Sequence, residues 1–435
     1  MKSYTKIGIF IITLFIIKTT YAQLPELQYF RYNDKRGLNV FETSKDTDVE
    51  FDGFKVRVGG SFSVIFQGLS QSNDDGLTAT LQDGSLAPLD LIELSNNFSL
   101  PTANFNIDAQ LADGLRLHLR TYLSSRHHPE AWVKGGYIQM DKLDFIRDGF
   151  LSGFMNVATI RFGMDEINYG DTHFRRSDNA RGIFNPFVGN YIMDAFTTEP
   201  FAEVTIQSNG LLGVVGVSNG RLNQSPTPGD DGFAFYAKLG YDNQVNDDLR
   251  LRLTGSLYSS SEESTRDYLY NGDRAGARYY NVLHTVSGNI VNPRGPSDFE
   301  PRFNTGFGNQ TSVMINPFVK FQGFEFFGVF EVANNGDSDV GGGFTHLGAE
   351  ALYRFGGSEQ FYLGGRYNSV SGEYADDLDS FDINRINLGG GFFMTRNVLA
   401  KIEYVTSTYD GDGIQGTKLQ GAEFNGVVVE ATIGF

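Results

Sequence analysis

Arginines alternate with leucines in the segment 115–120, and this spacing is the first sign of chemistry in the chain. Successive side chains of an extended strand point to opposite faces, so Arg116 and Arg120 share one face with His118 while the leucines occupy the other. Such a face carries two guanidinium groups with an imidazole between them. Guanidinium groups bind carboxylates and phosphates through paired hydrogen bonds, so the face is suited to anions.

The same alternation recurs in two further segments. Arg250 and Arg252 alternate with leucines, and Arg161 lies between two apolar residues. An arginine that faces hydrocarbon at mid-membrane costs roughly 2–4 kcal/mol, whereas one that faces water inside a barrel costs little. If these strands cross a membrane, we therefore expect all five arginines to line a water-filled interior, where they would concentrate anions.

Two other interpretations of the alternation remain open. The arginines could pair with acidic residues that also face inward, which would leave a nearly neutral wall. The inward acidic candidates are Glu203, Glu325, Glu331, Glu403 and Glu430. Alternatively, the alternation could belong to a water-soluble sheet whose arginines face solvent.

A second concentration of charge lies in the connection 166–198. Arg175, Arg176 and Arg181 fall within seven residues, among aromatic residues and near Pro186. Folded into a barrel interior, this connection would form a constriction with guanidinium donors suited to phosphate or carboxylate. Left outside, it would be a surface loop or a subunit contact.

The last strand of the chain has one wholly apolar face. Residues 427, 429, 431, 433 and 435 are all apolar and alternate with a mixed second face. The final residue, Phe435, resembles the C-terminal aromatic signal by which the barrel assembly machinery recognises bacterial outer-membrane barrels. We therefore expect the apolar face to contact lipid and the rest of the chain to complete a closed barrel.

Residues 1–22 have the features of a secretory signal peptide. Lys2 and Lys6 precede the apolar run 7–17, and Ala22 offers a small residue at the cleavage site. The run is shorter than the roughly 20 residues that a spanning helix needs. We expect cleavage after Ala22 and, together with the C-terminal strand, an outer-membrane location in a Gram-negative bacterium.

The composition narrows the class of protein. The chain has no cysteine, which excludes a disulfide framework and a thiolate metal site. Its 52 glycines, 38 phenylalanines and 21 tyrosines suit tight turns and interfacial aromatic residues. The formal charge of −17 argues against nucleic-acid binding. We expect the acidic clusters between the predicted strands to be solvated loops, or sites for divalent ions that bridge lipopolysaccharide. The sequence implies no cofactor and no resident metal.

Sixteen segments show strand alternation, and many form pairs joined by short turns rich in Gly, Asn and Asp. Long polar connections separate the pairs. The segments run near 53–68, 104–112, 115–124, 132–140, 157–165, 199–207, 211–218, 232–241, 249–259, 311–321, 324–334, 343–354, 360–371, 382–394, 398–408 and 423–435. Short turns within the pairs and long connections between them predict an all-β transmembrane antiparallel barrel of about 16 strands (14–18), with short periplasmic turns and long extracellular loops. A barrel of this size is wide enough to hold water.

Three segments need separate interpretation. Residues 23–52 precede the barrel, 53–435, and are expected to form a periplasmic arm. Pro101 fits the start of a strand, where its missing N–H does no harm. Residues 141–153 have helical spacing, so they predict a short helix at the rim or, alternatively, a further strand pair.

The chain resembles the family of phosphate-selective porins O and P, in its Bacteroidetes-type branch. The resemblance rests on Leu27-Gln-Tyr-Phe-Arg31, Lys35-Arg-Gly-Leu-Asn-Val-Phe41, Gly53-Phe-Lys-Val-Arg-Val-Gly-Gly60, Ile160-Arg-Phe-Gly163 and Phe174-Arg-Arg-Ser-Asp178, with the strand ladder to Phe435. It implies a sixteen-stranded barrel, usually trimeric, that passes anions through a lumen lined with basic residues. The lumen or constriction candidates that match are Arg116, Arg120, Arg161, Arg175, Arg176, Arg181, Arg250 and Arg252. The acidic overall balance departs from phosphate selectivity and favours a general porin for small polar or anionic solutes.

Two other classes of function are possible. A barrel-embedded hydrolase would need a catalytic histidine, but the six histidines are scattered, with only His127 and His128 adjacent and Glu130 nearby. The chain has neither a Gly-x-Ser-x-Gly nor a His-Glu-x-x-His motif. A non-conducting partner barrel of a secretion or surface complex is the other alternative.

Overall fold

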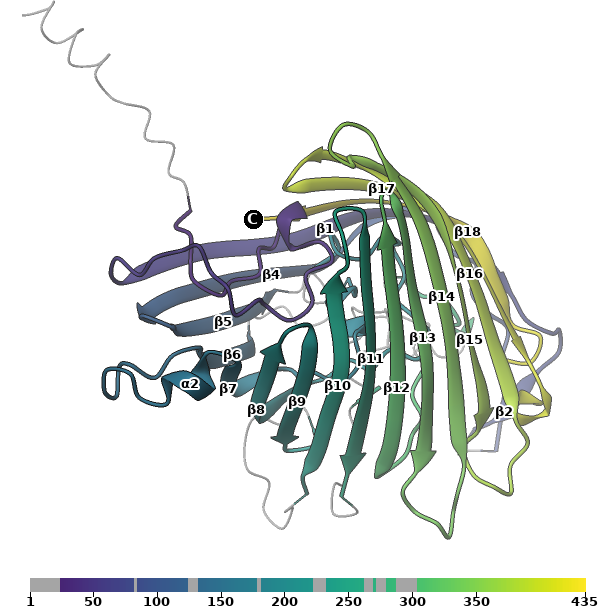
Figure 1. The fold of residues 1–435 in the computed structure, drawn as a ribbon. Helices are drawn as coiled ribbons and strands as arrows, with labels where there is room; N and C mark the ends of the chain where they lie inside the picture. The colour runs from purple at the N-terminus through teal and green to yellow at the C-terminus, as the bar shows by residue number, and fades with distance from the viewer. Residues whose placement is uncertain are drawn as a thin grey trace, which may run out of the picture.

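The computed structural model describes residues 24–81, 84–123, 132–177, 181–221, 232–261, 269–270, 279–286 and 303–435. Within them, sixteen strands form one closed antiparallel barrel in which each strand pairs with its neighbour and β1 pairs with β18 (Figure 1). The strands of the barrel are β1 (Lys55–Ser72), β4 (Asn97–Ala112), β5 (Leu115–Leu123), β6 (Trp132–Met140), β7 (Ala158–Glu166), β8 (Thr198–Ser208), β9 (Leu211–Ser218), β10 (Ala234–Gln244), β11 (Leu249–Ser260), β12 (Gln310–Phe321), β13 (Phe324–Asn335), β14 (Gly343–Phe355), β15 (Phe361–Glu373), β16 (Phe381–Thr395), β17 (Val398–Asp410) and β18 (Glu423–Gly434). The predicted sixteen-stranded transmembrane barrel is confirmed.

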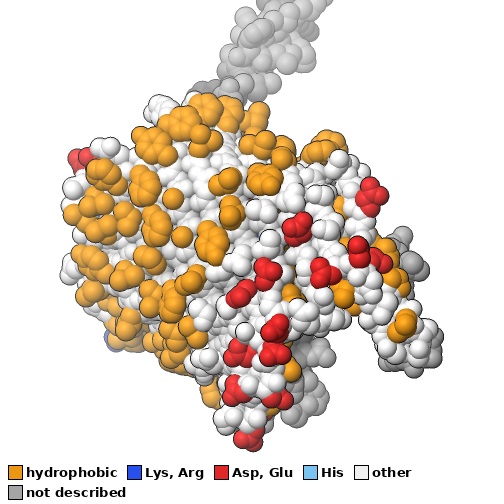
Figure 2. All heavy atoms as spheres, turned by 90° about the vertical axis from the view of Figure 1, so that its right-hand side faces the viewer, with side chains coloured by type: hydrophobic (Ala, Val, Ile, Leu, Met, Phe, Trp, Pro, Cys, Tyr) orange, Lys and Arg blue, Asp and Glu red, His pale blue; other side chains and the backbone are white. Residues whose placement is uncertain are grey.

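The period-two alternation of the strands separates an apolar outside from a polar inside. On β11, Leu251 and Leu253 are 39% and 56% exposed, whereas Arg252 and Thr254 are buried. Figure 2 shows hydrophobic side chains spread over much of one side of the wall, as a lipid-facing surface requires. The leucines lie on the outside of the barrel, which argues against a water-soluble sheet, because a soluble sheet would bury them.

The two ends of the barrel differ in the length of their connections. Turns of two residues join β4 to β5, β8 to β9, β12 to β13 and β16 to β17. The opposite end carries the long connections, including 73–96, which contains the small hairpin of β2 (Thr78–Thr80) and β3 (Leu86–Pro88). One long segment, 141–157, lies at the short-turn end, and it contains the short helix α2 (Ser152–Met155). The strand-pair alternative is wrong, but the predicted helix is confirmed only at its end, because residues 141–151 form turns and irregular structure and α2 overlaps the predicted segment only at Ser152 and Gly153.

Pro101 lies inside a strand and not at its start. The strand β4 begins at Asn97, four residues before Pro101. The register of β4 against β1 shifts between Ser63 and Ile65, opposite this proline. The bulge removes the need for a ladder hydrogen bond from the proline nitrogen, so the strand continues through it.

The hydrophobic core lies inside the barrel. Phe318, Phe327 and Val405 point inward from the wall and pack against Ile167 and Val188 of the connection between β7 and β8. That connection contains the 3-10 helix η2 (Thr172–Phe174), and the arm before β1 contains η1 (Lys35–Gly37). A further 3-10 turn, η4 (Asp412–Ile414), follows β17. The sequence predicts a lumen open to water, whereas the structure fills much of it with these inserted segments.

Candidate pore and the segments inside it

The predicted arginines of the strands β5 and β7 face the interior, and each is paired with a carboxylate of the same wall. The pairs are Arg116 with Asp108 at 2.9 Å, Arg120 with Asp165 at 2.7 Å, and Arg161 with Glu203 at 2.7 Å. Arg116 and Arg120 are buried, and the side chain of Arg161 is 20% exposed. This region of the wall is therefore an ion-pair lattice and not a bare cationic ladder.

The arginines of β11 are also paired, and one of them reaches the inserted connection. Arg250 pairs with Asp242 of the neighbouring strand at 2.7 Å. Arg252 forms ion pairs with Asp171 and Glu42, each at 2.8 Å. Since Asp171 belongs to the connection after β7 and Glu42 to the arm, Arg252 joins the wall to both inserted segments.

Asp171 is the acidic centre of this group. Its carboxylate also lies 2.9 Å from the Lys238 ammonium of β10 and accepts a hydrogen bond from Thr254. Burial alone would raise the pKa of Asp171, but the charges of Arg252 and Lys238 lower it well below its ordinary value. Asp171 therefore stays ionised and holds the connection to the wall over the physiological pH range.

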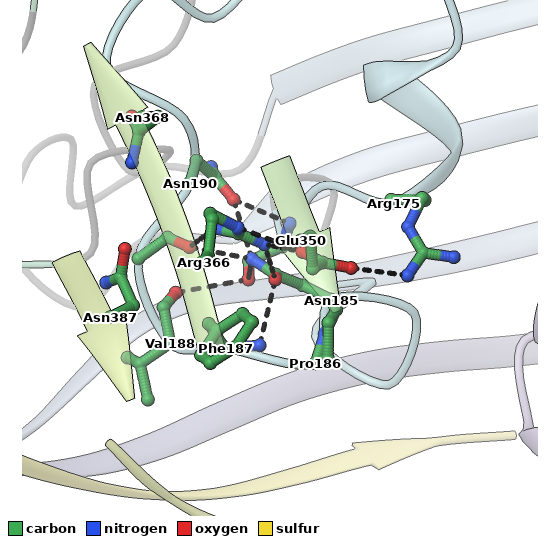
Figure 3. A network of polar contacts seen from close by, with 12 residues as sticks. Arg175, Asn185, Pro186, Phe187, Val188, Asn190, Glu350, Arg366, Asn368 and Asn387 are labelled. Atoms are coloured by element: carbon green, nitrogen blue, oxygen red, sulfur yellow. Dashed lines mark hydrogen bonds and ion pairs between the residues drawn. The ribbon is translucent and has the colours of Figure 1, made fainter. Parts of the chain in front are cut away.

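The connection 167–197 runs across the interior to the opposite wall. Arg175 donates hydrogen bonds to Glu325 of β13 at 2.6 Å and to Glu350 of β14 at 2.5 Å. Arg366 of β15 shares Glu350 at 2.7 Å and donates to Asn185 at 2.8 Å. Figure 3 shows this network, in which wall residues surround the tip of the inserted connection.

Backbone groups of the same connection are also bound by the wall. Val188 N–H donates to the Glu403 carboxylate at 2.8 Å, and Ile192 N–H donates to Asn368 at 2.9 Å. The Lys401 ammonium donates to the carbonyl oxygens of residues 182, 185 and 187. These contacts satisfy backbone groups that would otherwise be buried without partners, so the connection holds one defined position.

The two other predicted arginines of the connection serve its internal structure. Arg176 pairs with Glu166 at 3.1 Å and with Asp194 at 2.8 Å. Arg181 pairs with the second oxygen of Glu166 at 2.6 Å. Next to them, burial lowers the pKa of His173 well below its usual range, and Lys238 and Arg176 lower it further. The histidine is therefore neutral and adds no charge to the lumen.

The arm before β1 crosses the short-turn end of the barrel. Gln28 donates a hydrogen bond to Asp113 in the turn between β4 and β5, whereas Lys35 N–H donates to Arg396 O in the turn between β16 and β17. A Cβ atom on Gly434 would lie 2.1 Å from Asn33 O, so only glycine allows this close approach. Figure 1 places the arm at the same end as the C-terminus.

A cavity of about 120 Å³ remains between the arm, the inserted connection and the wall of β4 to β8. Arg31 of the arm reaches it, with its guanidinium 4.1 Å from the ring centre of Phe184, and donates to Phe174 O at 2.9 Å. Arg116, Arg120, Arg161 and Arg181 line the cavity together with Asp108, Asp165, Glu166 and Glu203. The cavity therefore carries both signs of charge in nearly equal number.

Sequence reasoning did not select several charged residues that face this interior. They are Lys238, Arg354, Arg366, Arg385 and Lys401, all buried on the inward face of their strands. A usable signal was present in β14, where Glu350, Leu352 and Arg354 alternate with the outward Ala351 and Tyr353. Arg385 and Arg366 lie in glycine-rich and asparagine-rich strands, where the alternation is weaker.

The histidines form no metal site in the part of the chain that the structure describes. His118 Nδ1 lies 2.9 Å from Asp108, and His346 Nδ1 lies 3.4 Å from Glu331. No group of three or more His, Asp or Glu side chains with metal-binding geometry occurs among the described residues. His127, His128 and Glu130 lie outside those residues.

Phe435 extends the pairing that closes the barrel. Its N–H donates to Gly60 O at 3.0 Å, and Gly60 N–H donates to Phe435 O at 3.2 Å. The ring is 41% exposed on the outside of the wall.

A search of the described residues for helices finds none with the length and apolar character to cross a membrane.

These features define an antiparallel transmembrane β-barrel of the outer-membrane type, with charged segments folded into its interior. The chain is similar in fold to OprB of Pseudomonas putida, with 11% identity and a TM-score of 0.51, over 88% of this chain and 94% of that one. It is also similar to the outer-membrane protein OmpT of Vibrio cholerae lacking loop L8, with 11% identity and a TM-score of 0.50, over 88% and 100% of the two chains. In-vitro folded OmpT gives 10% identity and a TM-score of 0.50, over 89% and 99%. No family model matches the chain, and no curated protein matches its sequence.

Proposed function

We propose that this protein is an outer-membrane porin-type channel, through which small hydrophilic solutes diffuse passively. The observation that carries the proposal is the division of charge by the closed barrel. The ion pairs of Arg116, Arg120, Arg161 and Arg252 all lie inside, while the outward face is apolar. Charged groups in a membrane protein mark a water-filled or solute path.

We further propose that the narrowest part of the path lies between the inserted connection and the wall. Arg175 holds this connection against β13 and β14, Arg176 and Arg181 fix it to Glu166 at the end of β7, and the arm narrows the cavity at the short-turn end. Solutes would pass beside the ion pairs, so selectivity would depend on small imbalances of charge and on width. Guanidinium groups present donors to a passing anion even when paired, which supports an anion preference.

The same proposal includes the processing of the chain, its location and its oligomeric state. Residues 1–22 would be removed as a signal peptide, the arm from residue 23 to 52 would face the periplasm, and the barrel would assemble as a homotrimer in contact with lipopolysaccharide. The assembly machinery would read Phe435. The resemblance to porins O and P supports phosphate as one candidate solute. This is a channel and not an enzyme.

A second candidate is a non-conducting barrel that serves a surface or secretion complex. The observation that favours it is the dense packing inside the lumen, where Phe318, Phe327 and Val405 are buried against the inserted connection. A packed interior of this kind adds stability but leaves little room for water.

A planar-bilayer recording of the purified full-length protein distinguishes the two candidates. We expect discrete conductance steps and, in a salt gradient, a reversal potential that indicates a mild anion preference. A protein that inserts as a heat-modifiable barrel but gives no conductance steps would refute the channel and favour the partner barrel. A cation preference would refute the anion preference alone.

A further inference from the structure

A second cavity lies at the long-loop end of the barrel, where β16 begins and β17 ends. It has a volume of about 110 Å³. Its lining includes Phe381 and Arg385 of β16, Tyr409 of β17 and Lys418 of the connection before β18. This cavity is separate from the one beneath the arm, and the arginines predicted from the sequence do not line it.

Arg385 differs from the inward arginines described above. Its side chain is 3% exposed, yet it forms no ion pair or hydrogen bond with the residues that the structure describes, and its Nε is buried without a partner. Its contacts are with aromatic rings: Tyr279, with a centre 5.8 Å away, and Phe424, at 5.4 Å. A buried guanidinium without a carboxylate is costly, because its hydration has been lost and no opposite charge replaces it. An anion would supply the missing partner.

The rest of the lining points to the kind of anion. Lys418 contributes a second cation, an ammonium that donates to Leu283 O at 2.8 Å, and none of the described lining residues is acidic. The lining also includes the aromatic rings of Phe303, Tyr374 and Phe381. The ring centres of Phe303 and Phe381 are 6.5 Å apart, and those of Tyr374 and Phe381 are 5.4 Å apart.

We propose that this cavity is a binding site for small aromatic carboxylates on the extracellular side of the channel. Arg385 would donate paired hydrogen bonds to the carboxylate, with Lys418 as the second cation. Phe303, Phe381 and Tyr374 would pack against the ring, since aromatic pairs favour edge and offset contacts at such distances. The proposal deepens the channel function and rests on it only for the transport that follows binding.

The aromatic lining separates this ligand class from inorganic anions. Phosphate could also pair with Arg385, but it would leave the rings of Phe303 and Phe381 in contact with a strongly hydrated ion. A neutral aromatic amide would fill the ring site but leave the guanidinium without a charge partner. Only a ligand with both parts satisfies the whole cavity.

The test measures binding and not conduction. The full-length protein, purified in detergent, is titrated with benzoate, with benzamide and with inorganic phosphate by calorimetry. We expect benzoate to bind at least about tenfold more tightly than the other two, because only it supplies both charge and ring. Arg385→Gln should weaken benzoate binding by roughly tenfold or more, and the matched variant of an exposed arginine, Arg147→Gln, should leave it unchanged.

A second variant covers the case in which Arg385→Gln does not fold. Lys418→Gln changes a half-buried residue of the connection and should weaken benzoate binding by several-fold while the barrel still forms. Equal binding of benzoate and phosphate, equal binding of benzoate and benzamide, or unchanged benzoate binding in folded Arg385→Gln would each overturn the proposal. Benzoate binding by a protein that shows no conductance would support this site and refute the channel. Conductance without benzoate binding would support the channel and refute this site.

Discussion

Asp171 and Arg252 form a two-point ion pair between the inserted connection and the barrel wall. Asp171 Oδ2 accepts a hydrogen bond from Arg252 Nε at 2.8 Å, and Oδ1 accepts one from Nη2 at 2.9 Å. Both side chains are buried, and Lys238 lies beside them. The pair therefore fixes the connection inside the lumen, and the Asp171 carboxylate compensates the positive charges of Arg252 and Lys238 at this point.

Asp171→Asn tests this role. The change keeps the shape of the side chain but leaves the cations of Arg252 and Lys238 with less compensation, so we expect a loss of roughly 3–5 kcal/mol. The measurement is the temperature at which the folded barrel band disappears in a heat-modifiability gel. Asp247→Asn, in an exposed turn, is the matched control. An unchanged unfolding temperature for Asp171→Asn would contradict the assigned role.

Charge reversal tests the lumen as the ion path. Arg120→Glu combined with Arg252→Glu replaces two inward cations by anions, so the reversal potential in a salt gradient should shift toward cation preference. Arg161→Gln offers a milder form, since its side chain is partly exposed and its removal leaves the Glu203 charge free. A folded variant with the wild-type reversal potential would exclude these side chains from the path.

The arm can be tested through one buried ring. Phe41 is 2% exposed, and its centre lies 5.3 Å from that of Phe318 and 4.2 Å from the Arg252 guanidinium. Phe41→Ala should weaken arm docking by about 3–5 kcal/mol, as for other buried phenylalanines. We expect faster proteolysis of the arm and a larger single-channel conductance. Glu50→Gln, at an exposed position of the arm, should change neither.

The C-terminal residue has two possible roles, which two variants separate. Deleting Phe435 removes the ring and the two backbone hydrogen bonds to Gly60, so less heat-modifiable barrel should assemble in outer membranes. Phe435→Ala keeps the backbone bonds and removes only the ring. A low yield of assembled barrel from both variants indicates that the ring is recognised. A normal yield from Phe435→Ala would assign the effect of the deletion to barrel closure.

The pH dependence follows from the lowered pKa of Asp171. A carboxyl whose pKa is lower in the folded state contributes stability above its unfolded pKa, and this contribution is lost only as pH falls toward the folded value. His173, kept neutral by burial, adds no transition near neutrality. We therefore expect the same single-channel conductance at pH 8 and pH 5. A conductance increase at pH 5 would show that the connection is released by protonation.

The strands could be predicted from the sequence because each has a polar side and an apolar side. The alternation of Leu251, Arg252 and Leu253 decides both the strand and its inward residue without knowledge of any neighbour. All sixteen segments were found this way. The small strands β2 and β3 were missed, because three residues are too few to show a period.

The partners of the inward charges could not be predicted. Arg175 pairs with Glu325, and Val188 with Glu403, across 150 and 215 residues of chain. Period-two alternation places a residue on a face but says nothing about which distant residue lies opposite. The extent to which the connection 166–198 narrows the lumen could not be predicted for the same reason, since its apolar side chains have no alternation that marks where they pack.

The long separation between these partners has a consequence for biogenesis. The connection after β7 leaves the ribosome long before β13 to β17, which supply many of the groups that bind it. Its polar and aromatic side chains therefore remain without their native partners until the last strands have paired and the barrel has closed. Maturation of this protein should then end with the settling of the internal segment, a step later than insertion itself.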